Sequence, residues 1–194
     1  GLPLAYSGGF NARPRLYVAA PLPVGFTGRR EVADFLLDER LEPAEFARRL
    51  GGQLPAGLEI LDAVEVDLRE PALAGRIQEA EYRVGLPAGA STDRLREAVE
   101  RLLAAGEIRR ARRASKGRLR EYDLRPLILD LRTVEGEEGP ALEMRLSARP
   151  GATGRPEEVL EELGLEPAEA DICRVRMTSE ILGNFGSHPP GGGG

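Results

Sequence analysis

The sequence predicts an α+β protein made of two similar units, and three observations lead to this prediction. Short runs in which apolar and polar residues alternate, as in half-buried strands, lie on both sides of runs with helical spacing. In the second half these runs follow the order strand, helix, strand, strand, helix, strand, and the later part of that order recurs in the first half. With 194 residues, of which 41% are hydrophobic, the chain can bury a core as one large or two small domains.

The second half begins with a predicted strand and a predicted helix. Residues 81–86 alternate, and the expected inward side chains are Tyr82, Val84 and Leu86. Ser91 or Thr92 then caps a helix, which Gly106 ends. Its expected apolar stripe is Leu95, Val99, Leu102 and Leu103.

Two further alternating runs, residues 122–133 and 141–148, predict a β-hairpin around the turn at residues 135–140. The inward side chains expected for this hairpin are Leu127, Leu129, Leu131, Leu142, Met144 and Leu146. A helix should begin at Pro156 and end at Gly164. Its stripe should contain Val159, Leu160 and Leu163. The last strand, residues 171–182, should place three side chains in the core, namely Cys173, Val175 and Met177.

This order is that of a ferredoxin-like (βαββαβ) unit. The first half has only the later part of it, in the predicted strands 15–20, 31–37 and 58–68 and a short helix from Pro43. We therefore expect two tandem ferredoxin-like units, the first lacking its leading strand and helix. The expected boundaries are a partial unit at 1–70, a linker at 71–80, a complete unit at 81–182 and a disordered Gly/Pro tail at 183–194. A missing strand and helix would leave a sheet edge uncovered, so we expect the chain to be N-terminally truncated.

Composition argues against several kinds of catalytic site. The single cysteine, Cys173, excludes a disulfide framework, and this chain alone cannot supply a cysteine zinc site or an iron–sulfur cluster. The single histidine, His188, lies in the tail, which argues against Ser-His-Asp or Cys-His catalysis. We therefore assign no catalytic or metal-ligating residue, although an Asp/Glu acid–base pair stays open among 32 carboxylates.

The longest uncharged internal run, residues 16–28, is too short to span a bilayer and is interrupted by two Pro and two Gly. No secretory apolar region follows Gly1. We expect a cytoplasmic protein without a membrane partner.

A basic stretch at residues 108–125 is the first candidate site. It holds eight cations against Glu121 and Asp123, a net charge of +6 in a chain whose net charge is −5. Such a focused positive field suits an anionic partner, RNA first, through phosphate contacts rather than base readout. The alternative is a solvated hairpin arm turning at residues 115–117, since only Tyr122 is available for base stacking. The candidate RNA- or anion-binding residues are Arg109, Arg110, Arg112, Arg113, Lys116, Arg118, Arg120 and Arg125.

The second candidate is the segment SGGFNARPR at residues 7–15. Paired glycines let a backbone turn closely around an anion, and Arg13 and Arg15 could hold it. The alternative is a structural turn before a strand, with Pro14 fixing the start of that strand.

The opening segment GLPLAYSGGFNARPR, followed by PLPVG at residues 21–25, resembles the radical-SAM-associated family of unknown function. Members of that family are fused to cobalamin-binding radical SAM proteins or encoded beside them. Residues 80–82, 123–128 and 155–159 extend the resemblance over roughly residues 1 to 165. Two departures are Ala12-Arg13 for the family's Pro-His and Gly8 for its Gln. The family-motif loop comprises Tyr6, Ser7, Gly9, Phe10, Asn11, Arg13, Pro14 and Arg15.

The resemblance implies a non-catalytic accessory or substrate-presenting module for a radical SAM enzyme. The iron–sulfur cluster, S-adenosylmethionine and cobalamin would then belong to the partner, with no cofactor on this chain. The basic stretch adds RNA or a ribonucleoprotein such as the ribosome as the expected partner. Two alternatives stay open. The tandem layout also looks like the RAMP-type RNA-binding proteins of CRISPR systems, which allows a metal-independent RNA-processing enzyme, and a purely protein-binding scaffold is the other.

Overall fold

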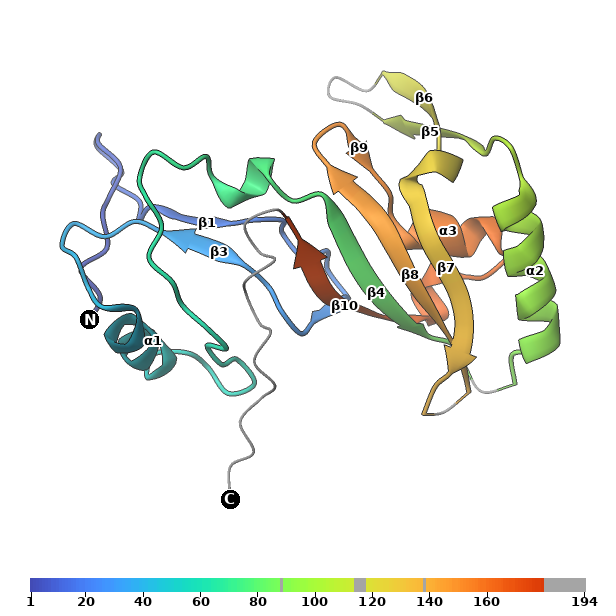
Figure 1. The fold of residues 1–194 in the computed structure, drawn as a ribbon, viewed down its shortest axis with the longest axis horizontal. Helices are drawn as coiled ribbons and strands as arrows, with labels where there is room; N and C mark the ends of the chain where they lie inside the picture. The colour runs from blue at the N-terminus through green and yellow to red at the C-terminus, as the bar shows by residue number, and fades with distance from the viewer. Residues whose placement is uncertain (88, 114–117, 138, 180–194) are drawn as a thin grey trace. The chain divides into compact units, whose positions relative to one another are not determined.

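The computed structural model describes residues 1–87, 89–113, 118–137 and 139–179 (Figure 1). It is a mixed α+β protein, as predicted, and it divides into two compact units. The N-terminal unit contains residues 1–21 and 31–76, and the C-terminal unit contains residues 22–30 and 77–178. The division therefore assigns residues 22–30 to the C-terminal unit, whereas the sequence-based boundaries place them in the first. His188 and the predicted tail at 183–194 lie outside the described residues.

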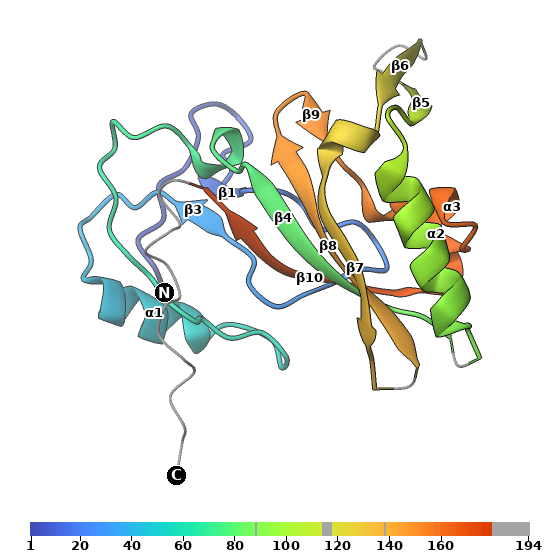
Figure 2. The same ribbon diagram turned by 45° about the vertical axis from the view of Figure 1, so that its right-hand side comes forward.

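The C-terminal unit is built on one sheet with the strand order β2-β10-β4-β8-β7. The strands are β2 (Thr27–Gly28), β10 (Asp171–Thr178), β4 (Glu79–Gly85), β8 (Pro140–Arg149) and β7 (Ile128–Glu135), and β9 (Ala152–Thr153) pairs with β8. Only β2 runs parallel to its neighbour, β10, and the pairs from β10 to β7 are antiparallel. Two helices, α2 (Thr92–Ala104) and α3 (Pro156–Glu162), lie on the same side of this sheet (Figure 2).

The core of this unit lies between the sheet and the two helices. The Ser91 side chain accepts a hydrogen bond from the backbone N–H of Arg94, which caps the start of α2 as predicted. Gly164 has a φ of +73°, a left-handed conformation that follows the end of α3 and suits glycine. Most of the predicted inward side chains are buried, and they include Tyr82, Val84, Leu86, Leu95, Val99, Leu102, Leu142, Met144, Leu146, Val159 and Leu160.

The predicted strand at residues 122–133 is interrupted. Its first residues end another strand at Asp123, a 3₁₀ turn (Arg125–Leu127) follows, and β7 begins only at Ile128. The register between β7 and β8 then shifts between Ile128 and Asp130. This bulge turns Leu129 outward, where it is 36% exposed, while Ile128 and Leu131 are buried. The prediction that Leu129 points inward is therefore wrong.

A second bulge, between Arg174 and Arg176, reverses which side chains of β10 face the helices on its two sides. Arg174 is opposite Tyr82 on the helix side and is buried, whereas Cys173 is opposite Arg83 and only half-buried. The prediction that Cys173 is a core residue is therefore wrong, although Met177 is buried as expected. Residues 180–182 of this predicted strand lie outside the described residues.

The N-terminal unit contains a two-stranded antiparallel sheet of β1 (Leu16–Val18) and β3 (Ala33–Phe35). Helix α1 (Pro43–Gly51) follows, and a short 3₁₀ helix spans Leu73–Gly75. The Phe35 and Phe46 rings pack edge to face, with 5.2 Å between their centroids, and link the sheet to α1. Residues 58–68 form no strand, contrary to the prediction, and no strand among the described residues pairs with them.

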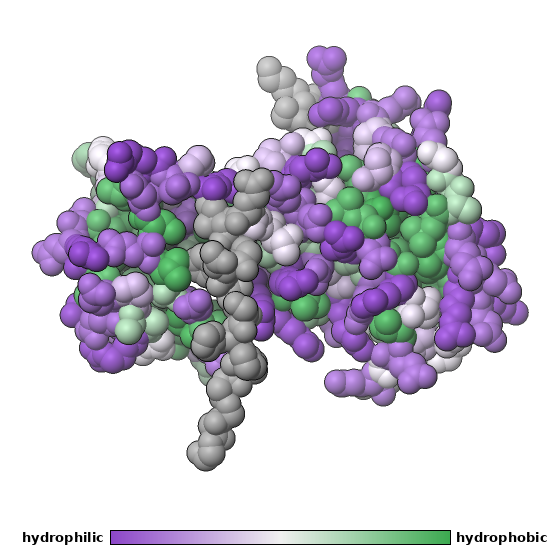
Figure 3. Space-filling model, viewed as in Figure 1, coloured by the Kyte–Doolittle hydropathy of each residue, from purple (hydrophilic) through white to green (hydrophobic). Residues whose placement is uncertain are grey.

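Little of the N-terminal unit is buried. Its buried apolar residues, among those described, are Ala5 and Ala19 alone, whereas the remaining buried apolar residues all lie between Ile77 and Met177. Apolar side chains are visible on its surface in Figure 3. Those that are exposed include Leu16, Tyr17, Val18, Leu58, Leu61, Val64, Val66 and Leu68.

Candidate nucleic-acid interface

The basic stretch forms a two-stranded antiparallel hairpin, which we call the arm, of β5 (Arg109–Arg113) and β6 (Leu119–Asp123). The arm follows α2 and projects away from the main sheet of the C-terminal unit (Figures 1 and 2). Because paired residues share a face of a hairpin, Arg110 and Arg112 lie on the same face as Tyr122 and Arg120. The alternation therefore divides the arginines between two faces.

The two β5 arginines on this face bind the acidic side chains of α3. The guanidinium of Arg110 donates to Glu161 and, at 2.7 Å, to Glu162. That of Arg112 donates to both carboxylate oxygens of Glu158, with an Nε–Oε1 distance of 2.7 Å. Each arginine side chain is only 22% exposed, so these ion pairs are partly shielded from water. They hold β5 of the arm against α3.

Tyr122 completes this attachment, because the guanidinium carbon of Arg112 lies 4.3 Å from the centre of its ring. The Tyr122 hydroxyl is buried and makes no hydrogen bond of regular geometry with the described residues. Burial and the nearby Glu158 carboxylate raise the pKa of this phenol. Tyr122 is therefore enclosed between the arm and α3, and its ring is not a free platform for a base.

The pKa shifts at this attachment favour the charged forms of its ion pairs. Burial by itself would raise the pKa of Glu158, but the hydrogen bonds and the charge of Arg112 outweigh it and the pKa is lowered. Burial likewise opposes the charge on Arg110, and its hydrogen bonds to Glu161 and Glu162 nevertheless raise its pKa. The shifts thus favour the charged forms of Arg110, Arg112 and Glu158.

Arg125 lies at the foot of the arm and bonds to backbone carbonyls. Its Nε donates to the carbonyl of Leu103 at 3.1 Å, and its Nη1 donates to that of Ile128 at 3.2 Å. The Leu103 carbonyl belongs to the last turn of α2, where cations are favourable. Arg125 therefore stabilises the junction between α2 and β7.

The other arm cations that the structure describes face solvent. Arg109 forms an exposed ion pair with Glu107 at 3.0 Å. The side chains of Arg113, Arg118 and Arg120 are exposed and make no ion pair or hydrogen bond within the part of the chain that the structure describes. Lys116 and the predicted turn at residues 115–117 lie outside it. The seven predicted cations that the structure describes thus divide into bound and solvent-facing groups.

The sheet face opposite the helices does not offer a comparable site. Its arginines are paired across the strands, and the pairs are Arg83–Glu143, Arg132–Glu143, Arg145–Glu79 and Arg176–Glu81. The only aromatic side chain in these strands is Tyr82, which is buried. Sheets that bind RNA through a face use exposed aromatic residues there. This face is therefore unsuited to base stacking.

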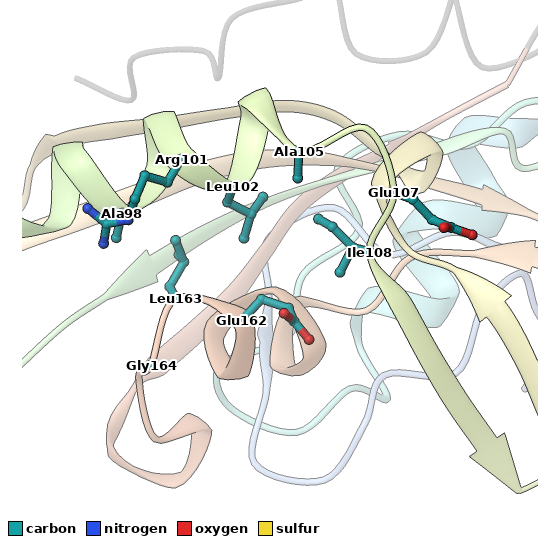
Figure 4. A pocket seen from close by; sticks show the side chains of 9 residues that line it. All are labelled: Ala98, Arg101, Leu102, Ala105, Glu107, Ile108, Glu162, Leu163 and Gly164. Atoms are coloured by element: carbon teal, nitrogen blue, oxygen red, sulfur yellow. The ribbon is translucent and has the colours of Figure 1, made fainter.

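A hollow of about 440 Å³ lies between the end of α2 and the end of α3 (Figure 4). Leu102, Ile108 and Leu163 line it, and its acidic residues Glu107 and Glu162 are those paired with Arg109 and Arg110. The described residues contain no group of three or more metal-binding side chains, and none of their helices has the length and apolarity to cross a bilayer. Both carboxylates of the hollow are thus engaged by arginines of the arm.

The segment at residues 7–15, in the N-terminal unit, forms a closed loop. The backbone N–H of Ser7 donates to the carbonyl of Arg13 at 2.8 Å, and the N–H of Arg13 donates to the Ser7 hydroxyl at 3.0 Å. Gly9 has a φ of +110°, which explains why glycine stands there. Phe10, Asn11, Arg13 and Arg15 are exposed. The hydrogen bonds that close the loop fit the interpretation as a structural turn. The two exposed arginines are also compatible with an anion-binding site.

The carboxylates of α3 were missed by the sequence reasoning. Glu158, Glu161 and Glu162 lie at helical spacings that place them along one side of α3, and this spacing is the signal that could have found them. The sequence gives no sign that this side meets the arm, because the paired residues are 46 to 52 positions apart.

Fold and surface together define an α+β protein with a basic hairpin arm. The chain belongs to a family described as an uncharacterized protein conserved in bacteria (DUF2344), which matches residues 1–156. The match includes the closed loop and the whole arm. No curated protein gives a significant match to the chain.

Proposed function

We propose that this protein is a non-catalytic accessory module that contacts RNA through the outer part of the arm. The observation that carries the proposal is the group of three solvent-facing arginines, Arg113, Arg118 and Arg120, which have no internal partner among the described residues. Guanidinium groups bind phosphates well, and here no existing ion pair need be broken. The ion pairs of Arg110 and Arg112 serve to hold these groups in place.

The topology of the C-terminal unit supports its assignment as a ferredoxin-like unit. The elements β4, α2, β7, β8, α3 and β10 follow the βαββαβ order, and the strands pair as β10-β4-β8-β7. That the N-terminal unit is a partial copy stays a prediction. A fold of this kind hosts many functions, so the RNA proposal depends on the arm.

The partner we propose is a radical SAM enzyme. What supports it is the resemblance of the opening segment, GLPLAYSGGFNARPR, which lies within the residues that match the family. The partner would supply the iron–sulfur cluster, S-adenosylmethionine and cobalamin. This protein would position an RNA or ribonucleoprotein substrate, which lowers the entropic part of the barrier to reaction.

Salt-dependent binding of a labelled single-stranded RNA tests the role of the arm. For single strands the logarithm of the binding constant should fall with the logarithm of salt concentration by roughly 0.7 for each phosphate contact. A variant carrying Arg113→Gln, Arg118→Gln and Arg120→Gln should therefore bind more weakly, with a slope smaller by about 2. The measurement is fluorescence anisotropy over a range of salt concentrations.

The matched control carries Arg94→Gln, Arg96→Gln and Arg101→Gln on α2, which removes the same charge from exposed positions of the same unit. It should retain the slope of the unmodified protein. Equal losses in the two variants, or an unmodified slope near zero, would contradict binding through the arm. Cleavage of the RNA by this chain alone would contradict the non-catalytic role and favour an RNA-processing enzyme.

A further inference from the structure

The loop at residues 7–13, which we call the Phe10 loop, stands on a fixed stem. The two hydrogen bonds between Ser7 and Arg13 close it, and a β-bridge joins Tyr6 to Pro14 just below. The stem continues into the small sheet, since the N–H of Ala5 donates to the carbonyl of Leu36 at 2.9 Å. The loop is therefore held by the hydrogen bonds of its stem, and the Phe10 side chain takes no part in them.

The tip presents an aromatic side chain to solvent. Phe10 is fully exposed, at 105% of its reference area, and follows Gly8 and the left-handed Gly9. Burying a phenylalanine side chain stabilises a folded protein by roughly 2 kcal/mol, and the exposed Phe10 does not contribute this stabilisation. No described side chain covers Phe10, so its ring is available to a ligand.

The charges around the ring favour an anionic ligand. Arg13 and Arg15, at the foot of the loop, are exposed and form no ion pair among the described residues. The sequence contains no Asp or Glu before Glu31, although 32 acidic residues occur in the chain. An exposed aromatic ring on the same short segment as two unpaired guanidinium groups matches a nucleotide, which has a base that can stack and a phosphate that can pair.

We propose that the Phe10 loop is a second contact for single-stranded RNA, in which Phe10 stacks on a base and Arg13 and Arg15 bind the adjacent phosphates. This proposal rests on the proposed function, from which it takes RNA as the ligand. It adds a contact that requires bases, whereas the arm requires only phosphates. Stacking on an aromatic side chain tolerates any base, so we expect little sequence preference.

The absence of tryptophan from the chain makes a direct test possible. In the Phe10→Trp variant the single indole should lose fluorescence when a base stacks on it. We expect quenching by oligouridylate and none by an abasic deoxyribose-phosphate oligomer of equal length, which keeps the phosphates. The matched control is Leu58→Trp, an exposed apolar position of the same unit next to Glu59, which should not respond to either.

Affinity gives a second, independent measurement. Phe10→Leu should weaken oligouridylate binding about tenfold, whereas Phe10→Tyr should keep most of it. Equal quenching of Phe10→Trp by the abasic oligomer or by polyglutamate would overturn the proposal in favour of a general anion or an acidic protein partner. If Phe10→Leu binds normally while the arm variant does not, this inference fails and the proposed function stands. If the unmodified protein binds no RNA, both fail.

Discussion

Arg112 and Glu158 form the most shielded contact between the arm and α3. Their side chains are 22% and 11% exposed, and the Arg112 guanidinium also lies over the Tyr122 ring. Removing one partner of such a pair leaves the other desolvated without compensation, which usually costs more than the intact pair contributes. The attachment of the arm should therefore be sensitive to single substitutions at these positions.

The Glu158→Gln variant should lose roughly 1 to 3 kcal/mol of unfolding free energy at pH 7. The difference should depend on pH in a defined direction. Because the folded protein lowers the pKa of Glu158, its contribution is fully present above the ordinary value of 4.5 and disappears as pH falls through the folded pKa. Urea denaturation at a series of pH values should show the two proteins converging in acid.

Glu157→Gln is the matched control, because Glu157 also lies in the first turn of α3 but makes no ion pair with the described part of the arm. Both substitutions remove one favourable charge from the helix N-terminus, which is worth less than 1 kcal/mol on an exposed turn. A constant difference between Glu158→Gln and the unmodified protein from pH 7 into acid would show that the Glu158 charge is not responsible.

Among the elements, strand β7 shows where local pattern and tertiary pairing disagree. Alternation alone places Leu129 and Leu131 on one face, but the bulge between Ile128 and Asp130 separates them. Leu131→Ala should therefore destabilise the protein by about 2 to 4 kcal/mol, because it leaves a cavity in the core. Leu129→Ala should cost less than about 1 kcal/mol, since its side chain is partly in water.

Thermal or urea denaturation of both variants measures this contrast. Equal losses would mean that β7 pairs with β8 without the bulge, and that the simple alternation is right. The two substitutions remove the same atoms from the same strand, so each serves as the control for the other.

The success of sequence-based prediction here depends on whether the signal is local. The cap at Ser91, the stripe of α2 and the alternation of β4 and β8 were predictable, because each follows from residues within one element. The bulges of β7 and β10 were not, since they arise from pairing with strands that are distant in the sequence. The positive charge of the arm could be predicted from the sequence. The division of its arginines into bound and solvent-facing groups could not, because the carboxylates that bind Arg110 and Arg112 come from α3.

Over the whole molecule, the two units differ in how much apolar surface they bury. The N-terminal unit has Ala5 and Ala19 as its buried apolar residues among those described, and its sheet has only two strands. The C-terminal unit buries fully such large side chains as Leu142, Leu146 and Leu160. Because hydrophobic burial is the main stabilising contribution to folding, the two units should not share one stability.

Hydrogen exchange should therefore detect two levels of protection. Amides of β1, β3 and α1 should exchange through low-energy openings, while those of β4 and β8 should require unfolding of the C-terminal unit. Phe46→Ala, which removes the contact with Phe35, should speed exchange in the first group and leave the second unchanged. Leu146→Ala should lower the protection of amides in β4 and β8 and should not slow hydrogen exchange anywhere. Equal protection in both groups, or a response of β4 to Phe46→Ala, would show that the units unfold together.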